Sequence, residues 1–442
     1  MAQGGLFDQV GGGFHRYTVD PTWTVPHFEK MLYVNAELAS LYLEAAATFG
    51  EARYREVATA TLDFLLREMT GPEGGFSASL DADSAPRPGA EKEEGAYYVF
   101  GAAEIAAALG EDAAAFGAAA GVTPGGNFEH GTNVLTRRRS DAELARLWAR
   151  ARPKLLAARE RRPRPDVDAK VIAGWYGLAI AALAEGYAAT GEDRYRAAAV
   201  RAAEHVLRVH RAGGSLARAS NGTRATGAAA LEDHAHLARG LALLFEVTGD
   251  RTMLEQALAL VDEAGRELGH PSGGWYASRA APPVPRRIEI VDGEEPAGAS
   301  AMTEVVLRLA SLTGRPALLE AHDRAERAHA RAARAAAMSA PGLLDAALLA
   351  RGPFYDVVVA GEGAAARALA EPIARLAPPW AVRATIPAAG AAAELVTLAP
   401  ALADKPARGG AATAYVCLRG ACKAPVSTPG ELRTQLVEGW SR

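Results

Sequence analysis

The chain has 442 residues, of which 49% are hydrophobic and 23% are charged, and its formal net charge is −4. These values are ordinary for a soluble protein with a large core, and the lack of a basic excess argues against a nucleic-acid-binding protein. No apolar run reaches the roughly 18 residues that a membrane-spanning helix needs, and two cysteines do not make a disulfide framework, so we expect a cytoplasmic protein with free thiols.

Ten segments show the i, i+3, i+4 spacing of apolar residues that is typical of helices. They run over residues 27–48, 53–69, 102–119, 141–160, 174–189, 193–210, 232–248, 251–268, 298–313 and 316–336. Tight turns such as Thr190-Gly191-Glu192-Asp193 join the two helices of a pair, and long polar loops separate the pairs. Because short connections make antiparallel neighbours, the sequence predicts five helical hairpins.

Self-similarity along the chain indicates a repeat architecture. Helical segments end in glycine pairs at Gly74-Gly75, Gly213-Gly214 and Gly273-Gly274. The simplest closed arrangement of such hairpins is an (α/α)6-type toroid, with the first helix of each pair inside and the second outside. The N-terminal loop at Gly4-Gly5 has the character of a loop that follows an outer helix, so we expect a toroid that lacks its first hairpin. Four histidines on predicted outer helices are expected to be solvated: His205, His210, His322 and His329.

The last hundred residues or so follow a different pattern. Apolar and β-branched runs predict strands at 355–361, 380–387 and 412–418, and helices at 364–376 and 429–437. This alternation indicates a small α/β segment. We therefore assign residues 1–340 to the helical toroid and residues 341–442 to the α/β segment. The turn from Gly361 to Gly363 lacks the third glycine and the acidic residue of a dinucleotide fingerprint, so we expect no cofactor.

Polar clusters occupy the long loops between hairpins. In an antiparallel array these loops all lie at one end of the ring, so we expect them to form one concave site. The predicted catalytic residues are His27, Glu29, Asp81, Asp83, Asp168, Glu232, Asp233 and His234. The predicted substrate-binding residues are His15, Arg16, Tyr17, Lys30, Tyr97, Lys170, Trp175, Trp275 and Glu295.

These residue types suit a sugar or a sugar-like metabolite. Aromatic rings can cover the apolar face of a sugar, and carboxylates in different environments can divide the acid and base roles. Two carboxylates hydrolyse glycosides, whereas histidines can move a proton on and off a carbon, as in sugar epimerisation. His27 is expected in the first turn of an inner helix, sharing one face with Lys30 and Met31.

Structural roles for the same residues stay open. Glu232 and Asp233 also suit a helix N-terminus, where acidic side chains serve as caps, and Trp175 also suits the inner core. His234 and His236 are two residues apart, so they cannot face one metal together, and no zinc pattern is present. We therefore predict no metal.

Several stretches resemble a long signature of the spermatogenesis-associated, thioredoxin-domain-containing protein family. They include GGLFDQVGGGFHRYTVDPTWTVPHFEKMLY, SLDADS, EGAYYVF, LEDHAHLARGLALLFEVTGD, VDGEEPAGAS and YVCLRGACKAPVSTPGEL. The resemblance implies a toroid similar to those of six-hairpin glycosidases and N-acylglucosamine 2-epimerase-type isomerases, preceded in the family by a thioredoxin-like domain. This chain departs from the pattern, because Tyr176 and Ala299 stand where the family usually has Asn, and Ala169 where it usually has Asp.

Two functions follow from these patterns. The first is a carbohydrate-active-like toroid that binds a sugar-like metabolite and isomerises or hydrolyses it, in the manner of a sugar epimerase or glycosidase. The alternative is a non-catalytic scaffold or interaction domain associated with a thioredoxin-like domain or protein. In either case we expect no nucleic acid and no membrane among the partners.

Overall fold

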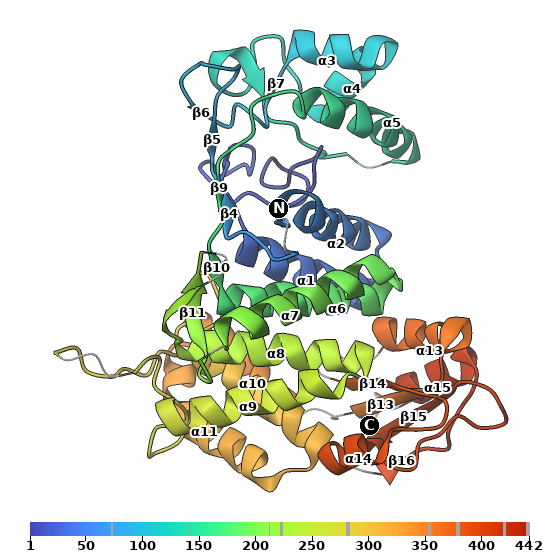
Figure 1. Cartoon of the computed structure of the whole chain (residues 1–442). Helices are drawn as coiled ribbons and strands as arrows, with labels where there is room; N and C mark the ends of the chain where they lie inside the picture. Colours follow the sequence, from blue (N-terminus) through green and yellow to red (C-terminus); the bar gives the residue numbers. More distant parts are fainter. Residues whose placement is uncertain are drawn as a thin grey trace. The chain divides into compact units, whose positions relative to one another are not determined.

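The computed structural model describes residues 1–71, 74–139, 141–211, 213–221, 224–279, 283–351, 355–376, 381–418 and 421–438. The chain folds into two compact units. The first comprises Met1–Ala39, Arg55–Pro72 and Phe76–Ala169, and the second Ser40–Tyr54, Glu73–Gly75 and Lys170–Arg442. Helices dominate the structure (Figure 1), which confirms the mainly α fold. Among the helices that the structure describes, none has the length and apolar character needed to cross a bilayer.

Most helices agree closely with the segments predicted from apolar spacing, with two exceptions described below, and the helices at Pro341–Arg351 and Ala393–Leu398 were not predicted. Their bounds are α1 (Leu32–Phe49), α2 (Ala52–Phe64), α3 (Ala102–Leu109), α4 (Ala113–Ala120), α5 (Ala142–Arg159), α6 (Ala173–Thr190), α7 (Asp193–His210), α8 (Leu231–Thr248), α9 (Arg251–Leu268), α10 (Gly298–Thr313), α11 (Pro316–Ala335), α12 (Pro341–Arg351), α13 (Gly363–Leu376), α14 (Ala393–Leu398) and α15 (Pro429–Glu438).

The strands are short in the N-terminal unit and longer near the C-terminus. Their bounds are β1 (Tyr17–Thr18), β2 (Pro26–His27), β3 (Lys30–Met31), β4 (Ser79–Leu80), β5 (Asp83–Ser84), β6 (Glu93–Glu94), β7 (Phe100–Gly101), β8 (Thr132–Asn133), β9 (Val167–Asp168), β10 (Val171–Ile172), β11 (Ala217–Ser220), β12 (Ala225–Ala228), β13 (Tyr355–Ala360), β14 (Val382–Ile386), β15 (Thr413–Leu418) and β16 (Ala421–Cys422).

The first predicted helix begins at Leu32 and not at residue 27. His27 pairs with Tyr17 in β1–β2, and Lys30 pairs with Leu80 in β3–β4. The expectation that His27 and Lys30 share a helix face was therefore wrong. Pairing with Tyr17 and Leu80, which lie outside this stretch, holds it extended, and spacing within the stretch itself does not reveal that. The second exception is the break between α3 and α4 at Gly110, where φ is 58°.

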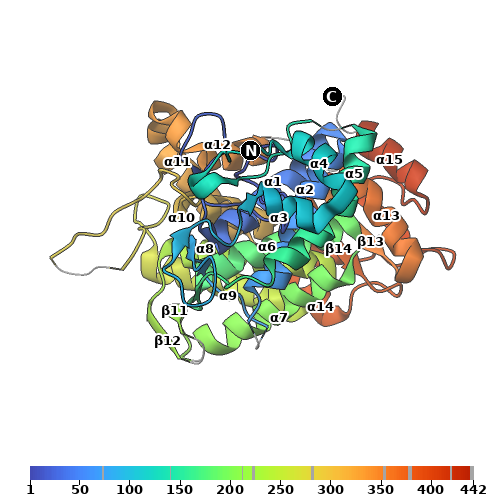
Figure 2. The same ribbon diagram turned by 90° about the horizontal axis from the view of Figure 1, so that it is seen from above.

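Helices α6 to α11 form three antiparallel hairpins in the second unit, and α8 lies between α6 and α10 (Figure 1). Every residue from Tyr176 to Ala184 of α6 is buried, as expected for an inner helix. Figure 2 shows the β11–β12 hairpin beside α7. This alternation of inner and outer helices is the one predicted for an α/α toroid.

The histidines that we expected to be solvated are buried. His205, His210, His322 and His329 are between 1% and 5% exposed. His210 bonds the Ala217 carbonyl and the Ser220 hydroxyl, and His322 Nδ1 bonds the Thr303 carbonyl at 3.0 Å. The prediction was wrong because these side chains lie on the inward faces of the outer helices, where a ring nitrogen can still find a polar partner.

The inner helices α6 and α8 cross at two glycines. A Cβ on Gly177 would lie 2.2 Å from the carbonyl carbon of His236, and one on Gly240 would lie 2.4 Å from the Gly177 oxygen. Backbones approach this closely only where side chains are absent. The crossing brings the first turns of α6 and α8 together.

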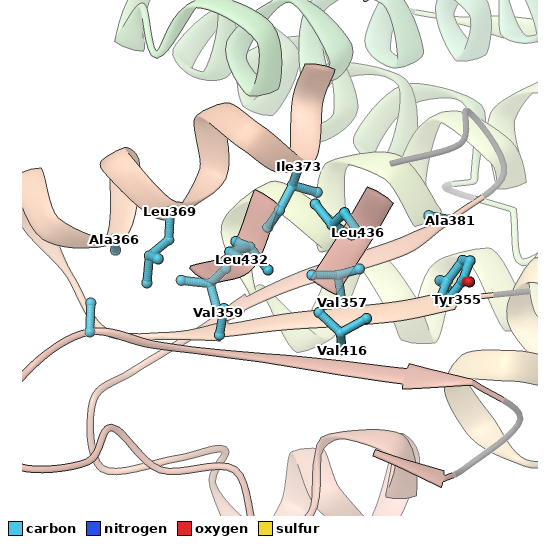
Figure 3. Close-up of a cluster of buried hydrophobic side chains, with 12 residues drawn as sticks. Tyr355, Val357, Val359, Ala366, Leu369, Ile373, Ala381, Val416, Leu432 and Leu436 are labelled. Atoms are coloured by element: carbon cyan, nitrogen blue, oxygen red, sulfur yellow. The ribbon is translucent and has the colours of Figure 1, made fainter. Parts of the chain in front are cut away.

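The C-terminal segment has the predicted α/β architecture. Its sheet has the order β14-β13-β15-β16, with β13 parallel to β14 and antiparallel to β15. Helices α13 and α15 place Leu369, Ile373, Leu432 and Leu436 over Val357 and Val359 of the sheet (Figure 3). The segment belongs to the same compact unit as α6–α11, and the domain boundary at residue 340 stays a prediction.

Cys417 and Cys422 form a disulfide across β15 and β16. The expectation of free thiols was therefore wrong. The two residues lie opposite each other in the antiparallel pairing of β15 with β16, which spacing alone does not reveal.

Candidate functional site

The predicted site residues are divided between the two units, and each group is described by itself. The first unit holds His15, Arg16, Tyr17, His27, Glu29, Lys30, Asp81, Asp83, Tyr97 and Asp168. The second unit holds Lys170, Trp175, Glu232, Asp233, His234, Trp275 and Glu295. The convergence of all these residues on one rim stays a prediction.

In the first unit, His27 is the centre of a partly exposed polar group. Its Nδ1 lies 2.6 Å from Glu94 Oε1, and its ring stacks on Tyr17 with 4.9 Å between ring centroids. Arg16 and Glu29 form an ion pair of 2.9 Å, and Glu29 also lies 3.8 Å from His27. Glu94 was not among the predicted catalytic or binding residues, and its contact with His27 spans 67 residues.

The predicted aspartates of the first unit lie near a lysine that the sequence did not single out. Lys92 Nζ is 2.6 Å from Asp166 Oδ2, and this bond, with smaller contributions from Asp81 and Asp83, raises the pKa of Lys92. Strands β4 and β9 place Asp168 opposite Ser79. Asp81, Asp83 and Asp168 are partly exposed, and Asp166 is exposed.

His15 and Lys30 lie in the interior of the first unit. Lys30 donates to Asp8 Oδ2 at 2.9 Å and to the Gly12 carbonyl at 2.9 Å, and Arg159 binds Asp8 through both terminal nitrogens. Burial lowers the pKa of Lys30 to about 8 and that of His15 to about 3. His15 is therefore neutral at physiological pH, with Nδ1 2.8 Å from the Phe28 carbonyl.

In the second unit, Asp233 ties the starts of α6 and α8 together. Its carboxylate accepts from Ala230 N at 2.8 Å, from Gly174 N at 3.1 Å and from Arg218 at 2.9 Å. The capping role that the sequence left open is thus the observed geometry of Asp233. Arg218 also donates to Glu232 Oε1 at 2.8 Å, which holds that carboxylate beside the helix start.

Glu295 lies at the N-terminal ends of the same two helices. Trp175 Nε1 donates to Glu295 Oε1 at 2.5 Å, and His236 Nε2 is 4.0 Å from Oε2. Burial raises the pKa of Glu295 to about 7, helped by the charges of Glu232 and Asp233 and opposed by the Trp175 bond. Glu295 is therefore partly protonated at neutral pH, which a general acid requires.

His236 completes this group. It is 1% exposed, and burial lowers its pKa to about 4. The ring bonds the Pro296 carbonyl, while Nε2 has no hydrogen-bond partner among the described residues. The Pro296 bond is therefore made by Nδ1–H, which leaves the basic Nε2 lone pair toward Glu295. We define Glu295, His236, Trp175, Glu232 and Arg218 as the Glu295 group.

His234, which the sequence favoured over His236, faces a different set of partners. Its Nδ1 donates to the Ala230 carbonyl at 2.8 Å, and its Nε2 lies 3.4 Å from Glu263 Oε1. Glu263 and Glu267 could hold a cation with it, but Arg211 already binds Glu263 and Arg279 already binds Glu267. The arrangement is an ion-pair network in which Arg211 and Arg279 already balance the two carboxylates.

The remaining predicted residues of the second unit differ in exposure. Trp275 is 5% exposed and pairs with Gly269 through its backbone, whereas Lys170 is exposed. The pairing of Glu295 with Trp175 spans 120 residues, so no local pattern revealed it. The raised pKa of Glu295 comes from burial and from the charges of Glu232 and Asp233, and the Trp175 bond opposes it.

No family model matches the chain. Spermatogenesis-associated protein 20 of Homo sapiens is 32% identical, over 99% of this chain and 61% of the human protein. The Mus musculus protein of the same name is 35% identical, over 71% of this chain and 45% of that protein. The chain therefore spans less than two thirds of the length of these relatives.

Solved structures show weaker similarity. Cellobiose 2-epimerase from Spirochaeta thermophila aligns with a TM-score of 0.47 and 14% identity, over 75% of this chain and 66% of that one. An unsaturated glucuronyl hydrolase from a Bacillus species aligns with a TM-score of 0.39 and 15% identity, over 67% and 61% of the two chains. Similarity at this level carries no information about chemistry.

Proposed function

Since the chain belongs to the spermatogenesis-associated protein 20 family, we propose its function from its own side chains: the Glu295 group binds a sugar or sugar-like metabolite and acts on it by acid–base chemistry. The observation that carries this proposal is the pair formed by Glu295 and His236. One side chain is a carboxyl with its pKa raised to about 7, and the other is an imidazole that burial keeps neutral.

The two side chains have complementary roles. Protonated Glu295 donates its proton to an oxygen of the ligand and becomes a carboxylate. His236 Nε2 accepts a proton through its free lone pair and becomes an imidazolium, which the Glu295 carboxylate 4.0 Å away stabilises. A donor and an acceptor of this kind suit proton transfer on and off a carbon next to a carbonyl, as in sugar isomerisation.

Hydrolysis of a glycoside uses the same group differently. Glu295 would protonate the leaving oxygen, and Glu232, whose carboxylate Arg218 holds at 2.8 Å, would serve as the second carboxylate. Trp175 is partly exposed, and its ring can cover the apolar face of a sugar while its Nε1 holds Glu295. The two reactions differ in their products and are separated by experiment.

The test is turnover of a panel of monosaccharides and disaccharides in D₂O, followed by NMR. Deuterium at a ligand carbon indicates isomerisation, and new reducing ends indicate hydrolysis. We expect Glu295→Gln to reduce either activity by about a hundredfold or more, as loss of a general acid does. The control is Glu289→Gln, an exposed carboxylate of the same loop. Equal activity in Glu295→Gln and Glu289→Gln would contradict the proposal.

The alternative of a scaffold for a thioredoxin-like partner stays a prediction, and no contact among the described residues favours it. It would gain support if the panel gave no turnover while a thioredoxin-like protein co-eluted with the chain.

A further inference from the structure

We propose that the first unit contains a binding site for a small oxyanion, a carboxylate or a phosphate, in the cavity beside Lys30. The cavity is entirely within this unit and has a volume of about 30 Å³. Its lining includes Lys30, Arg67, Arg159, Arg164, Tyr97 and Tyr98. The site is independent of the Glu295 group and of the function proposed for it.

The cavity is lined by hydrogen-bond donors that lack acceptors. The hydroxyls of Tyr97 and Tyr98 are buried and have no partner among the described residues, and the same is true of Arg159 Nε. Tyr97 and Tyr98 are 4% and 6% exposed. Burial raises the pKa of both tyrosines, so their hydroxyls stay protonated. Because an unmet buried donor destabilises the fold, these groups indicate a missing acceptor.

Positive charge in the lining exceeds negative charge. The four cationic side chains face two carboxylates, Asp8 and Glu68, which leaves a net charge of +2. Asp8 is saturated by Lys30, Arg159 and the backbone N–H groups of Val10 and Gly11. It therefore has no lone pair left for the tyrosine hydroxyls. An added oxyanion would supply acceptors for the hydroxyls and would also offset the excess positive charge.

Water is the competing occupant. A volume of about 30 Å³ holds about two waters, and these would satisfy the hydroxyls but leave the excess charge unchanged. An anion can reach the cavity at the side of Arg164, whose side chain is 51% exposed while it binds Glu68 at 2.6 Å. Arg67, which also binds Glu68, is 32% exposed. These two guanidiniums can turn toward an entering anion.

The experiment is thermal unfolding of the whole chain with inorganic phosphate or acetate, at constant ionic strength made up with sodium chloride. We expect a saturable rise in Tm with one of the two anions, because a ligand that binds only the folded state stabilises it. Which anion is active identifies the source of the oxyanion. The absence of a saturable rise with either anion at millimolar concentration would overturn the proposal.

Variants show whether the cavity is the site. Tyr97→Phe with Tyr98→Phe removes the unmet hydroxyls and should raise the apparent Kd about tenfold, the loss expected for hydrogen bonds to a charged group. Arg164→Gln should raise it similarly, and it changes a half-exposed side chain. The matched control is Arg150→Gln, since Arg150 is 55% exposed and binds Asp112 at 2.8 Å in the same unit. An equal Kd in Arg164→Gln, the tyrosine variant and the control would place the anion elsewhere and refute the site.

Discussion

Burial acts on Glu295 and His236 in opposite directions. It raises the pKa of Glu295 to about 7 and lowers that of His236 to about 4, because desolvation disfavours the charged form of each group. Between these two values both side chains are neutral, one with a proton to give and the other with a lone pair to receive one. The proposed acid–base chemistry is a property of this pair and not of either residue alone.

Tryptophan fluorescence tests the state of Glu295. Trp175 Nε1 donates to the Glu295 carboxyl, so ionisation of that carboxyl should change the emission of Trp175. We predict a transition with a midpoint near pH 7 that is absent in Glu295→Gln and in Trp175→Phe. The two variants separate this signal from that of the other five of the six tryptophans. A midpoint below pH 5 would show that Glu295 is an ordinary surface carboxylate.

From the burial of His15 we predict that the protein loses stability in mild acid. Burial lowers its folded-state pKa to about 3, with Lys30 adding to the effect, whereas the unfolded value is about 6.5. The unfolded chain therefore takes up a proton first, and stability falls as the pH decreases from 6.5 toward 3. Between pH 7.5 and pH 5 the contribution is about 2 kcal/mol.

Urea unfolding at several pH values measures this contribution. His15→Gln keeps a donor for the Phe28 carbonyl but does not titrate, so its stability should depend less on pH than that of the wild type by about 2 kcal/mol. The control is His130→Asn, because the His130 side chain is 70% exposed. A parallel pH dependence in wild type and His15→Gln would contradict the assignment.

At the scale of elements, the crossing of α6 and α8 depends on the absence of side chains at Gly177 and Gly240. Gly177→Ala places a Cβ 2.2 Å from the His236 backbone, so the helices must move apart. We predict a destabilisation of about 2 kcal/mol or more, as for other overpacked cores. Gly265→Ala on α9 is the control, since nothing lies within 4 Å of its Cβ. That change should be neutral or stabilise by about 0.5–1 kcal/mol. A larger loss of stability in Gly265→Ala than in Gly177→Ala would refute the crossing.

Buried ion pairs connect the inner helices to one another. Arg308 of α10 binds Glu246 of α8 at 2.7 Å, with both side chains below 5% exposure. Arg308→Met leaves the Glu246 charge buried, and we predict a loss of about 3–5 kcal/mol in urea unfolding. The double variant with Glu246→Met should recover most of the lost stability. Arg251→Met is the control, because Arg251 and Glu255 are an exposed pair that contributes about 0.5 kcal/mol or less.

Across the whole molecule, the helices could be predicted from the sequence, whereas the contacts between site residues could not. Helices repeat an apolar spacing that is visible within each segment, so their bounds agree closely with the sequence prediction. The two-residue strands that hold His27 and Lys30 depend on pairing partners outside the segment, Tyr17 and Leu80. The same reason hides the bond from Trp175 to Glu295, and it led us to favour His234 over His236. Residue types on the loops were informative, whereas partners and pKa shifts needed the structure.

Thermal unfolding with a panel of carbohydrates, at pH 6 and at pH 8, shows whether the Glu295 group binds a sugar. We expect at least one sugar to raise the Tm of the wild type in a saturable way. The rise should be larger at pH 6, where Glu295 carries its proton. It should no longer depend on pH in Glu295→Gln, whose side chain does not ionise, and it should be lost in Trp175→Ala. The opposite result, in which no sugar raises the Tm or the rise is the same in both variants as in the wild type, would contradict a carbohydrate site at Glu295.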